Sequence, residues 1–554
     1  MLKITLIKEL RSEPEIIEVE KGTTIETVVE NYQNQLPYRV IAAKMHNTLV
    51  DLTDTIEEET TLELLDMRTQ AANLIYEKSL SLIYLKAVND VMGPEVIVHI
   101  DNALNKGLYT EIKAKTPVTA EQVADIEKRM KEIVTADIPF IKYECSEEEG
   151  KRIMEDDGYP QKVRLLESMN VKRVKFYSLD GYRNFFYGLM TPSSGYIEYF
   201  QLMKYRNGVL LRFPHPSNPK VIPEYVDEKK MYAAFGEATR WQKLLGVSYV
   251  DDLNEKVRNG GYKDLIQLSE ALHEKKIAEI ADMIKEQKKR IVLIAGPSSS
   301  GKTTFAKRLC IQLRVNGLNP LYLGTDDYFV EREQTPLDEN GEKDFERLEA
   351  VDIDLFNKHM NALLAGETVD LPTFNFLTGH KEYGNRRLTL SPGQPIVIEG
   401  IHALNDAMTP YIDPSQKFKI YISPLTQLNI DEHNRISTTD SRMLRRMVRD
   451  FRYRGHDAQA TIRSWPKVRK GEDKYIFPYN GEADVFFNSV HIYEFAVLKK
   501  YAAPLLAEIG QDEPEYMDAQ RMLKFLKYFS VIEDDSIIVN NSIIREFIGG
   551  SVFV

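Results

Sequence analysis

The stretch Ile291-Val-Leu-Ile-Ala-Gly-Pro-Ser-Ser-Ser-Gly-Lys-Thr-Thr-Phe305 decides how the second half of this chain folds. It contains the pattern G-x-x-x-x-G-K-[ST] directly after an apolar, β-branched run and directly before a helix-like pattern. In that context a buried strand ends, a small-residue loop turns back, and successive backbone N–H groups point into one concavity. The positive N-terminal end of the following helix also attracts anions. The stretch therefore predicts a polyphosphate site formed by Gly296, Pro297, Ser298, Ser299, Ser300, Gly301, Lys302, Thr303 and Thr304.

Two side chains of this loop carry chemistry of their own. Lys302 would reach the β- and γ-phosphates of a nucleotide, and the Thr303 hydroxyl would ligate Mg²⁺. The competing interpretation is a plain Gly/Ser-rich turn, which the combination of strand, Lys, Thr and helix disfavours. We therefore expect ATP and Mg²⁺ as cofactors, although the motif alone does not separate ATP from GTP.

Composition sets wide bounds on the rest of the chain. At 554 residues it is too long for one core, and usual domain sizes suggest about three or four domains. The 72 basic and 84 acidic residues give a net charge of −12, which argues against a protein built mainly to coat nucleic acid. Only Cys145 and Cys310 occur, so neither a zinc site nor a disulfide framework is indicated. Since no apolar run approaches membrane-spanning length either, we expect a cytoplasmic protein.

The patterning along the chain predicts five regions. Short alternating strands and one helix in residues 1–66 suggest a β-grasp module, and residues 67–225 read as α+β. Residues 226–288 look helical, and we expect them to be a connector with a solvated face. Residues 289–505 alternate strands with helices, as a parallel α/β domain does. Residues 506–554 read as a C-terminal helical extension.

Carboxylates follow two of the strands expected after the loop. Asp326 and Asp327 come after Pro320–Leu323, at the end of a strand expected to neighbour the phosphate loop. One of them could accept a proton from an attacking hydroxyl, whereas a turn with an Asx hydrogen bond is the alternative. Glu399 ends a second apolar strand, where a carboxylate meets Mg²⁺ through water. A simple helix-capping carboxylate is the competing interpretation there.

Six arginines crowd one short helical segment, and Arg442, Arg445, Arg446 and Arg449 fall on one face of it. Surface ion pairs with neighbouring aspartates would explain one or two of the six. We therefore expect a cationic face that closes over phosphates as a lid. A basic helix of this kind could also contact RNA.

The order of these motifs resembles the uridine kinase/phosphoribulokinase family of phosphate-loop kinases across roughly residues 289–495. The matching segments, in family order, are GPSSSGKTT, TDDYF, DFERLEAVD, PTFNF, VIEGIHAL, RMVRDFRYRG and EADVFFNS. The resemblance implies that Asp326 is the catalytic aspartate and Glu399 the metal-side glutamate. Our favoured hypothesis is that Lys302 and the lid arginines Arg445, Arg449 and Arg454 stabilise the transferring phosphoryl group.

The acceptor region departs from that family. Glu346 falls where uridine kinases place a ribose-binding aspartate, and Phe374 and Phe376 fall where a Tyr and a Phe stack on the base. His380 lies one residue beyond the position of the base-reading His, and Lys381 replaces an Arg, which is not equivalent at a bidentate site. The Phe pair could equally belong to the core. The expected acceptor-binding set is Asp327, Tyr328, Glu346, Phe374, Phe376, His380 and Lys381.

The front half resembles two modules of a different family. Residues 1–66 resemble the TGS β-grasp domain, and residues 67–225 resemble the editing-type domain of threonyl-tRNA synthetase. That family carries HxxxH on one helix and a Cys and a His in a second segment. Here those four positions hold Lys78, Leu82, Phe186 and Met190. Without the polar groups neither metal nor general-base chemistry is expected, so we interpret this half as a binding or structural module.

The chain as a whole resembles bacterial uridine kinase-like proteins with fused TGS and synthetase-like domains. This implies an ATP-dependent kinase for a nucleoside 5′-hydroxyl, with uridine or cytidine first. A kinase of another small sugar or sugar phosphate is the runner-up. The rival from another class is a nucleotide-switched factor that binds tRNA or the ribosome through the front half. No membrane partner is expected, and the sequence leaves open whether the chain forms homo-oligomers.

Overall fold

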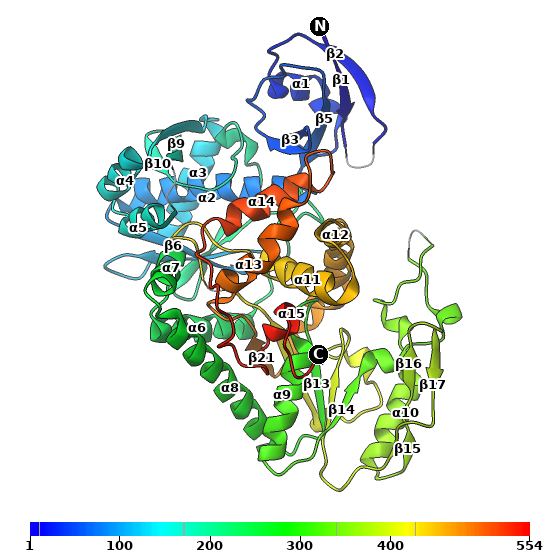
Figure 1. Cartoon of the computed structure of the whole chain (residues 1–554). Helices are drawn as coiled ribbons and strands as arrows, with labels where there is room; N and C mark the ends of the chain where they lie inside the picture. Colours follow the sequence, from blue (N-terminus) through cyan, green and yellow to red (C-terminus); the bar gives the residue numbers. More distant parts are fainter. Residues whose placement is uncertain (10–11, 170–171, 339–340, 427) are drawn as a thin grey trace.

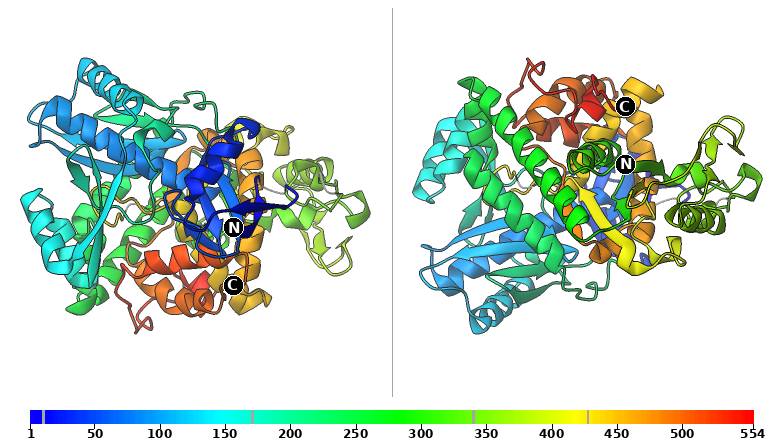
Figure 2. Two further views of the ribbon diagram at one scale, coloured as in Figure 1. Left: turned by 90° about the horizontal axis from the view of Figure 1, so that it is seen from above. Right: turned by 90° about the horizontal axis from the view of Figure 1, so that it is seen from below.

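The computed structural model describes residues 1–9, 12–169, 172–338, 341–426 and 428–554. Figures 1 and 2 show a small sheet at the N-terminal end, a mixed layer beside it, and a parallel sheet further along the chain. Within the described residues, no helix combines the length and the apolar character needed to cross a membrane.

The N-terminal sheet has the strand order β2-β1-β5-β3-β4, in which β1 and β5 are parallel. The Thr24 side chain caps helix α1 of this region by accepting a hydrogen bond from the Thr27 amide. The sheet and its helix match the prediction of a small strand-rich unit. The elements are β1 (Leu2–Ile7), β2 (Glu15–Val19), α1 (Ile25–Tyr32), β3 (Val40–Met45), β4 (Thr48–Val50) and β5 (Thr61–Asp66).

Two antiparallel sheets follow, in the orders β11-β12-β7-β6 and β10-β9-β8. They pack around α2 (Gln70–Met92), whose middle turns are buried on every side. The buried hydroxyls of Ser79 and Ser81 donate to helix carbonyl oxygens one turn back, which satisfies them inside the core. The other elements are β6 (Ile97–Leu104), β7 (Gly107–Lys113), α3 (Ala120–Thr135), β8 (Ile141–Ser146), α4 (Glu147–Asp156), α5 (Pro160–Met169), β9 (Arg173–Leu179), β10 (Tyr182–Asn184), β11 (Gln201–Tyr205) and β12 (Gly208–Arg212).

Three helices lead to the parallel sheet: α6 (Lys229–Leu245), α7 (Val250–Arg258) and α8 (Tyr262–Glu286). The last of them has the expected solvated face. Its other face, which includes Ile277, Ile280 and Ile284, is fully buried against the helix that follows the phosphate loop. The helix is therefore part of a hydrophobic core as well as a connection.

The five-stranded sheet has the order β14-β19-β13-β20-β21, with every neighbouring pair parallel. This confirms the α/β class. One expectation was wrong: the strand before Asp326 is not next to the phosphate-loop strand, because β19 lies between them. The elements are β13 (Ile291–Ala295), α9 (Lys302–Val315), β14 (Leu321–Gly324), α10 (Ile353–Leu364), β19 (Ile396–Glu399), β20 (Lys417–Ser423), α11 (Thr438–Arg454), α12 (Ala458–Tyr475), β21 (Val485–Asn488) and α13 (Glu494–Ala507).

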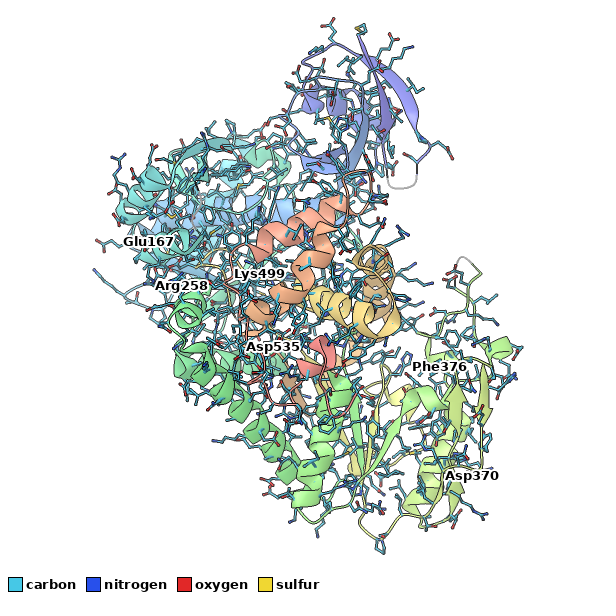
Figure 3. The ribbon with its side chains drawn as sticks, viewed as in Figure 1. Glu167, Arg258, Asp370, Phe376, Lys499 and Asp535 are labelled. Atoms are coloured by element: carbon cyan, nitrogen blue, oxygen red, sulfur yellow. The ribbon has the colours of Figure 1, made fainter. Side chains whose placement is uncertain are left out.

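A side lobe projects from this sheet, as Figure 1 shows. It contains α10 and two short ribbons, and Figure 3 labels Phe376 and Asp370 on it. The ribbon strands are β15 (Val369–Asp370), β16 (Thr373–Asn375), β17 (His380–Glu382) and β18 (Arg387–Leu388).

The C-terminal region contains α14 (Tyr516–Leu526) and the short α15 (Arg545–Ile548). The sequence predicts an extension, but the chain folds back. Ile543 and Phe547 are fully buried in the same core cluster as β13 and α9. The end of the chain therefore packs against the phosphate-loop region.

Candidate active site at the phosphate loop

The loop between β13 and α9 has the backbone that its glycines predict. A Cβ at Gly296 would lie 2.0 Å from the Ile422 carbonyl oxygen of β20, so only glycine fits where the loop passes that strand. Gly301 has φ +85°, a conformation that favours glycine, and Ser299 has φ 60°. The loop therefore turns tightly into the N-terminus of α9.

Thr303 and Glu399 meet at the carboxyl edge of the sheet, where Glu399 lies level with Gly324 of β14. Thr303 Oγ1 donates to Glu399 Oε1 at 2.9 Å, and the Tyr322 hydroxyl donates to the same oxygen at 2.5 Å. Glu399 Oε2 is buried and, among the described residues, has no hydrogen-bond partner. Burial raises the pKa of this carboxyl group. One oxygen is thus held by protein donors while the other remains available to a cation or its water.

Lys302 lies folded back on its own loop. Its Nζ donates to the carbonyl oxygens of Gly296 at 2.9 Å and Pro297 at 3.2 Å. Burial lowers the pKa of this ammonium group, while the negative charges of Glu399 and nearby carboxylates act in the opposite direction. A polyanion in the loop would therefore restore a strong partner to a desolvated cation.

Asp326 lies in a 3₁₀ turn, Thr325–Tyr328, that directly follows β14. A Cβ at Gly400 would lie only 2.0 Å from Thr325 Oγ1, so this turn packs closely on the end of β19. The Asp326 carboxylate is open to solvent. The surrounding protein nevertheless raises its pKa by desolvation, partly offset by the charge of Lys302. The aspartate is thus electrostatically coupled to the loop lysine.

The arginines of α11 do not form the predicted cationic face. Arg445 has 0% exposure, and its Nε and Nη2 donate to the two carboxylate oxygens of Glu494 at 2.5 and 2.6 Å. Its Nη1 donates to the Ser299 carbonyl oxygen at 3.3 Å. Arg445 therefore supports the loop from behind, and its charge is already neutralised. The sequence prediction failed because Glu494 lies on a different helix.

Arg446, Arg449 and Arg454 are also paired, but they lie closer to the surface than Arg445. Arg449 and Arg454 both contact Asp450, at 2.8 and 3.6 Å, and the Arg454 side chain is 54% exposed. Arg446 donates from Nη1 to the Ser298 hydroxyl of the phosphate loop at 2.9 Å. Arg446 thus donates to a side chain of the loop, whereas Arg445 donates to the loop backbone. The resemblance did not single out Arg446.

Several predicted acceptor residues already have partners inside the protein. Asp327 accepts from Arg386 at 2.6 Å, Lys381 pairs with Asp352 at 2.9 Å, and His380 pairs with Glu331 at 2.6 Å. The pair of Asp327 and Arg386 joins the side lobe to the turn that carries Asp326. The charges of the three predicted residues are therefore already partly compensated.

The aromatic residues of the predicted set divide between core and surface. Tyr328 has 0% exposure and its ring packs at right angles on Phe356, which places it in the core rather than on an acceptor surface. Phe374 is 4% exposed, whereas Phe376 is 58% exposed with its ring 5.2 Å from that of Phe374. Only Phe376 of these offers an open aromatic face.

Glu346 lies beside the region of α11 and α12. Desolvation and the nearby charges of Asp344 and Glu472 raise the pKa of its carboxyl group to about 7. A Cβ at Gly471 would lie 1.7 Å from Glu346 Oε2, so the glycine in α12 makes room for this carboxylate. The sequence offered no signal for that contact.

In the front half, the positions that correspond to the synthetase site hold mostly core side chains, and Lys78 and Phe186 line a pocket beside them. Leu82, Phe186 and Met190 are 0%, 2% and 2% exposed and belong to one core cluster. Lys78 donates from Nζ to the Tyr187 carbonyl oxygen, and burial lowers its pKa to about 7. Across the described residues, no group of three or more His, Cys, Asp or Glu side chains could hold a metal ion.

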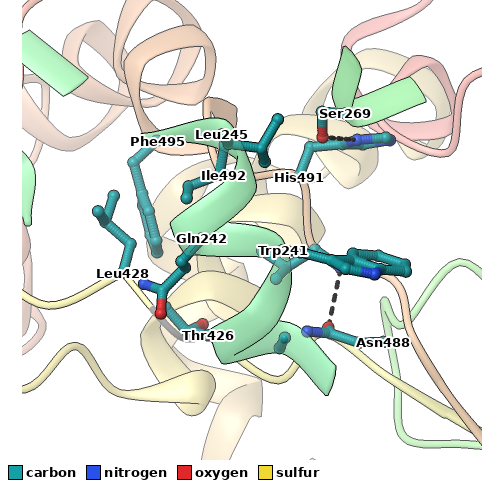
Figure 4. Close-up of a pocket in the computed structure, with 12 residues that line it drawn as sticks. Trp241, Gln242, Leu245, Ser269, Thr426, Leu428, Asn488, His491, Ile492 and Phe495 are labelled. Atoms are coloured by element: carbon teal, nitrogen blue, oxygen red, sulfur yellow. Dashed lines mark hydrogen bonds between the residues drawn. The ribbon is translucent and has the colours of Figure 1, made fainter. Parts of the chain in front are cut away.

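A separate pocket lies between α6 and the loop before α13 (Figure 4). Its lining includes the apolar side chains Trp241, Leu428 and Phe495, and its His491 already bonds to Ser269 at 2.9 Å. The lining contains no carboxylate. The chemistry therefore points to the phosphate loop as the candidate active site.

Comparisons with known proteins agree with this geometry. Residues 291–496 match the model of the phosphoribulokinase/uridine kinase family. A uridine kinase from Chloroflexus aurantiacus is 29% identical over 198 residues, which is 36% of this chain and 85% of that protein. A possible uridine kinase structure from Bacillus stearothermophilus aligns at 21% identity over 38% of this chain and 97% of that chain, with a TM-score of 0.27.

The front part is similar to a second group. Threonine–tRNA ligase of Caldanaerobacter subterraneus is 27% identical over 187 residues, or 34% of this chain. The chain spans only 29% of the length of that ligase. The chain therefore combines an N-terminal part similar to threonine–tRNA ligases with a C-terminal part, residues 291–496, that matches the model of the phosphoribulokinase/uridine kinase family.

Proposed function

We propose that this protein transfers the γ-phosphoryl group of ATP to a hydroxyl of a nucleoside, with uridine or cytidine as the first candidates. The observation that carries the proposal is the meeting of the phosphate loop, Thr303, Glu399 and Asp326 at one edge of the parallel sheet. Phosphoryl transfer needs positioning and charge stabilisation more than covalent chemistry from the protein.

The loop amides and Lys302 would hold the phosphates of ATP. Mg²⁺ fits the site because Glu399 Oε2 is buried with no hydrogen-bond partner in the described part of the chain, and Thr303 Oγ1 lies next to the same carboxylate. The nucleotide and water would complete the coordination, as is usual for Mg²⁺. When bound, the cation supplies charge neutralisation at the phosphates.

Asp326 is our candidate for the general base. It would accept the proton of the attacking 5′-hydroxyl, which requires the ionised form. A raised pKa makes the carboxylate a better proton acceptor than an ordinary aspartate. Arg446, Arg449 and Arg454 are candidates for stabilising the transferring group, whereas Arg445 acts as a positioning residue behind the loop.

The acceptor would lie between the side lobe and α12. Phe376 offers an exposed ring for stacking on a base, and Glu346 offers a carboxylate for the ribose hydroxyls. His380 and Lys381 would reach the acceptor only beside their present partners Glu331 and Asp352. Phe376 and Glu346 are therefore our first candidates for acceptor contacts.

The test is an assay of the full chain with ATP and Mg²⁺ against nucleosides, small sugars and sugar phosphates, with ADP measured and products identified by mass. A nucleoside monophosphate supports the proposal, and loss of that product in a Lys302→Ala variant ties it to the loop. A phosphorylated sugar instead would move the assignment to the runner-up acceptor class. ADP without any phosphorylated acceptor would favour a nucleotide-switched factor, with tRNA as the next ligand for the front half.

A further inference from the structure

The C-terminal segment places a carboxylate on the phosphate loop. Glu546, in α15, is 7% exposed, and its Oε2 accepts a hydrogen bond from Thr304 Oγ1 at 2.7 Å. The same oxygen lies 3.4 Å from the Thr304 backbone nitrogen, which also donates to it. Beside this contact, a Cβ at Gly301 would lie 2.5 Å from Ile543 Cγ2. The end of the chain therefore covers the start of α9 at two adjacent points.

The Glu546 carboxylate lies where a phosphate oxygen of a bound nucleotide would accept hydrogen bonds from Thr304. Thr304 is the third residue of α9, where backbone N–H groups have no partner within the helix. These free donors and the helix dipole are what make a loop of this kind bind phosphate. A carboxylate satisfies the same donors and carries the same sign of charge. It must therefore compete with a nucleotide for Thr304.

A second carboxylate occupies the other side of the loop. Glu472 of α12 accepts from the Ser298 amide at 2.9 Å, and it also pairs with Arg442 through both oxygens. Lys302 is bound to loop carbonyls instead of to an anion. Groups of the chain itself thus satisfy donors of three loop residues, Ser298, Lys302 and Thr304, that would otherwise serve the phosphates.

We propose that Glu546 makes the C-terminal segment an autoinhibitory device of the phosphate loop, so that a nucleotide binds only when this carboxylate leaves Thr304. The inference rests on the proposed function of the loop as an ATP site. It adds that the affinity for nucleotide is set by competition with the chain's own carboxylate.

The movement that frees the loop is a rotation of the Glu546 side chain. The neighbouring residues Ile543, Ile544, Phe547 and Ile548 are between 0% and 2% exposed, so release of the whole segment would expose a large apolar surface. The phenyl ring of Phe547 also lies 4.9 Å from the guanidinium group of Arg445. The backbone of the segment therefore stays in place, and only the Glu546 side chain changes its conformation.

The test is equilibrium binding of Mg²⁺–ATP to the full-length protein by calorimetry, in wild type and Glu546→Gln. The amide keeps the size of the side chain and an acceptor for Thr304 but removes the charge that competes with phosphate. We expect the variant to bind about tenfold tighter or more, because the binding-competent population rises and a like charge is removed. Glu546→Asp, which withdraws the carboxylate by one methylene, should move affinity in the same direction.

Glu533→Gln is the matched control, because Glu533 is an exposed glutamate of the same C-terminal region. Its affinity should equal that of wild type, and melting curves should show that all variants are folded. Equal or weaker ATP binding by both Glu546 variants would overturn autoinhibition while leaving a nucleotide site in place. Failure of every protein, including wild type, to bind nucleotide would overturn both this inference and the proposed function.

Discussion

The phosphate loop and helix α2 each hold a lysine that burial has made less basic, but the two surroundings differ. Lys302 lies near the carboxylates of Asp326 and Glu399 and donates to carbonyl oxygens of the loop. Lys78 lies beside the carbonyl oxygen and the ring of Tyr187. The other three positions that correspond to the polar residues of the synthetase hold buried apolar side chains. Similarity to an enzyme therefore predicts catalysis only in a region that keeps the polar side chains needed for the reaction.

The sharpest way to break this comparison is to remove the loop lysine. Lys302→Ala should lower phosphotransfer by about 10²–10³-fold or more, because a preorganised cation at the phosphates is lost. Steady-state ADP release and product mass measure the effect. Lys285→Ala, at an exposed position near the end of α8, should keep normal activity. Equal activity of the Lys302 variant and this control would contradict the assignment.

The second test asks whether Arg445 stabilises the fold behind the phosphate loop or takes part in catalysis. Arg445→Ala would leave Glu494 buried without its partner, so we expect a loss of about 3–5 kcal/mol in the free energy of unfolding. Arg454→Ala removes an exposed pair and should cost about 0.2–1 kcal/mol. Urea unfolding curves measure both. Similar small costs would show that Arg445 is not the buried support described here.

The third test uses pH to examine Asp326. Since the pKa of this carboxyl is raised above the ordinary 3.8, kcat/KM should fall as the pH falls through a midpoint above that value. Asp326→Asn should lower the rate by about 10²–10⁴-fold and abolish this acid limb. An unchanged limb in the Asn variant would assign the titration to another group.

The smallest effect is expected for a substitution of Lys78 in the front half, and it concerns the stability of the fold. The pKa of Lys78, about 7 in the folded protein, lies below its ordinary 10.5, so the unfolded chain binds the proton more tightly. Its contribution to stability therefore rises between about pH 7 and 10.5. Lys78→Met should remove this slope and raise the melting temperature at pH 7 by roughly 2–4 °C. Phosphotransfer should not change, and a large loss would contradict a purely structural role.

The sequence predicted the local features well and the long-range ones poorly. The loop, the strands around it and the helix over residues 25–32 follow from patterns that lie within a few residues of each other. The order of the sheet was missed because nothing local shows that β19 separates β14 from β13. The partners of the arginines were missed for the same reason.

Among the site residues, the sequence found those within motifs and missed those brought in by packing. Glu472, Glu494 and Glu546 lie outside the segments that suggested function, yet each contacts the loop or its supporting arginines. An excess of arginines over nearby acids was the one signal available. This excess is compatible with a cationic lid or with buried ion pairs, and only the fold distinguishes the two.

The most direct test of the central comparison measures both candidate activities in one preparation of the full chain. The protein is given ATP, Mg²⁺ and nucleosides in one reaction and mischarged tRNA in another, and both products are quantified. The account predicts a nucleoside monophosphate in the first reaction and no deacylation above background in the second. Deacylation without nucleoside phosphorylation would contradict it.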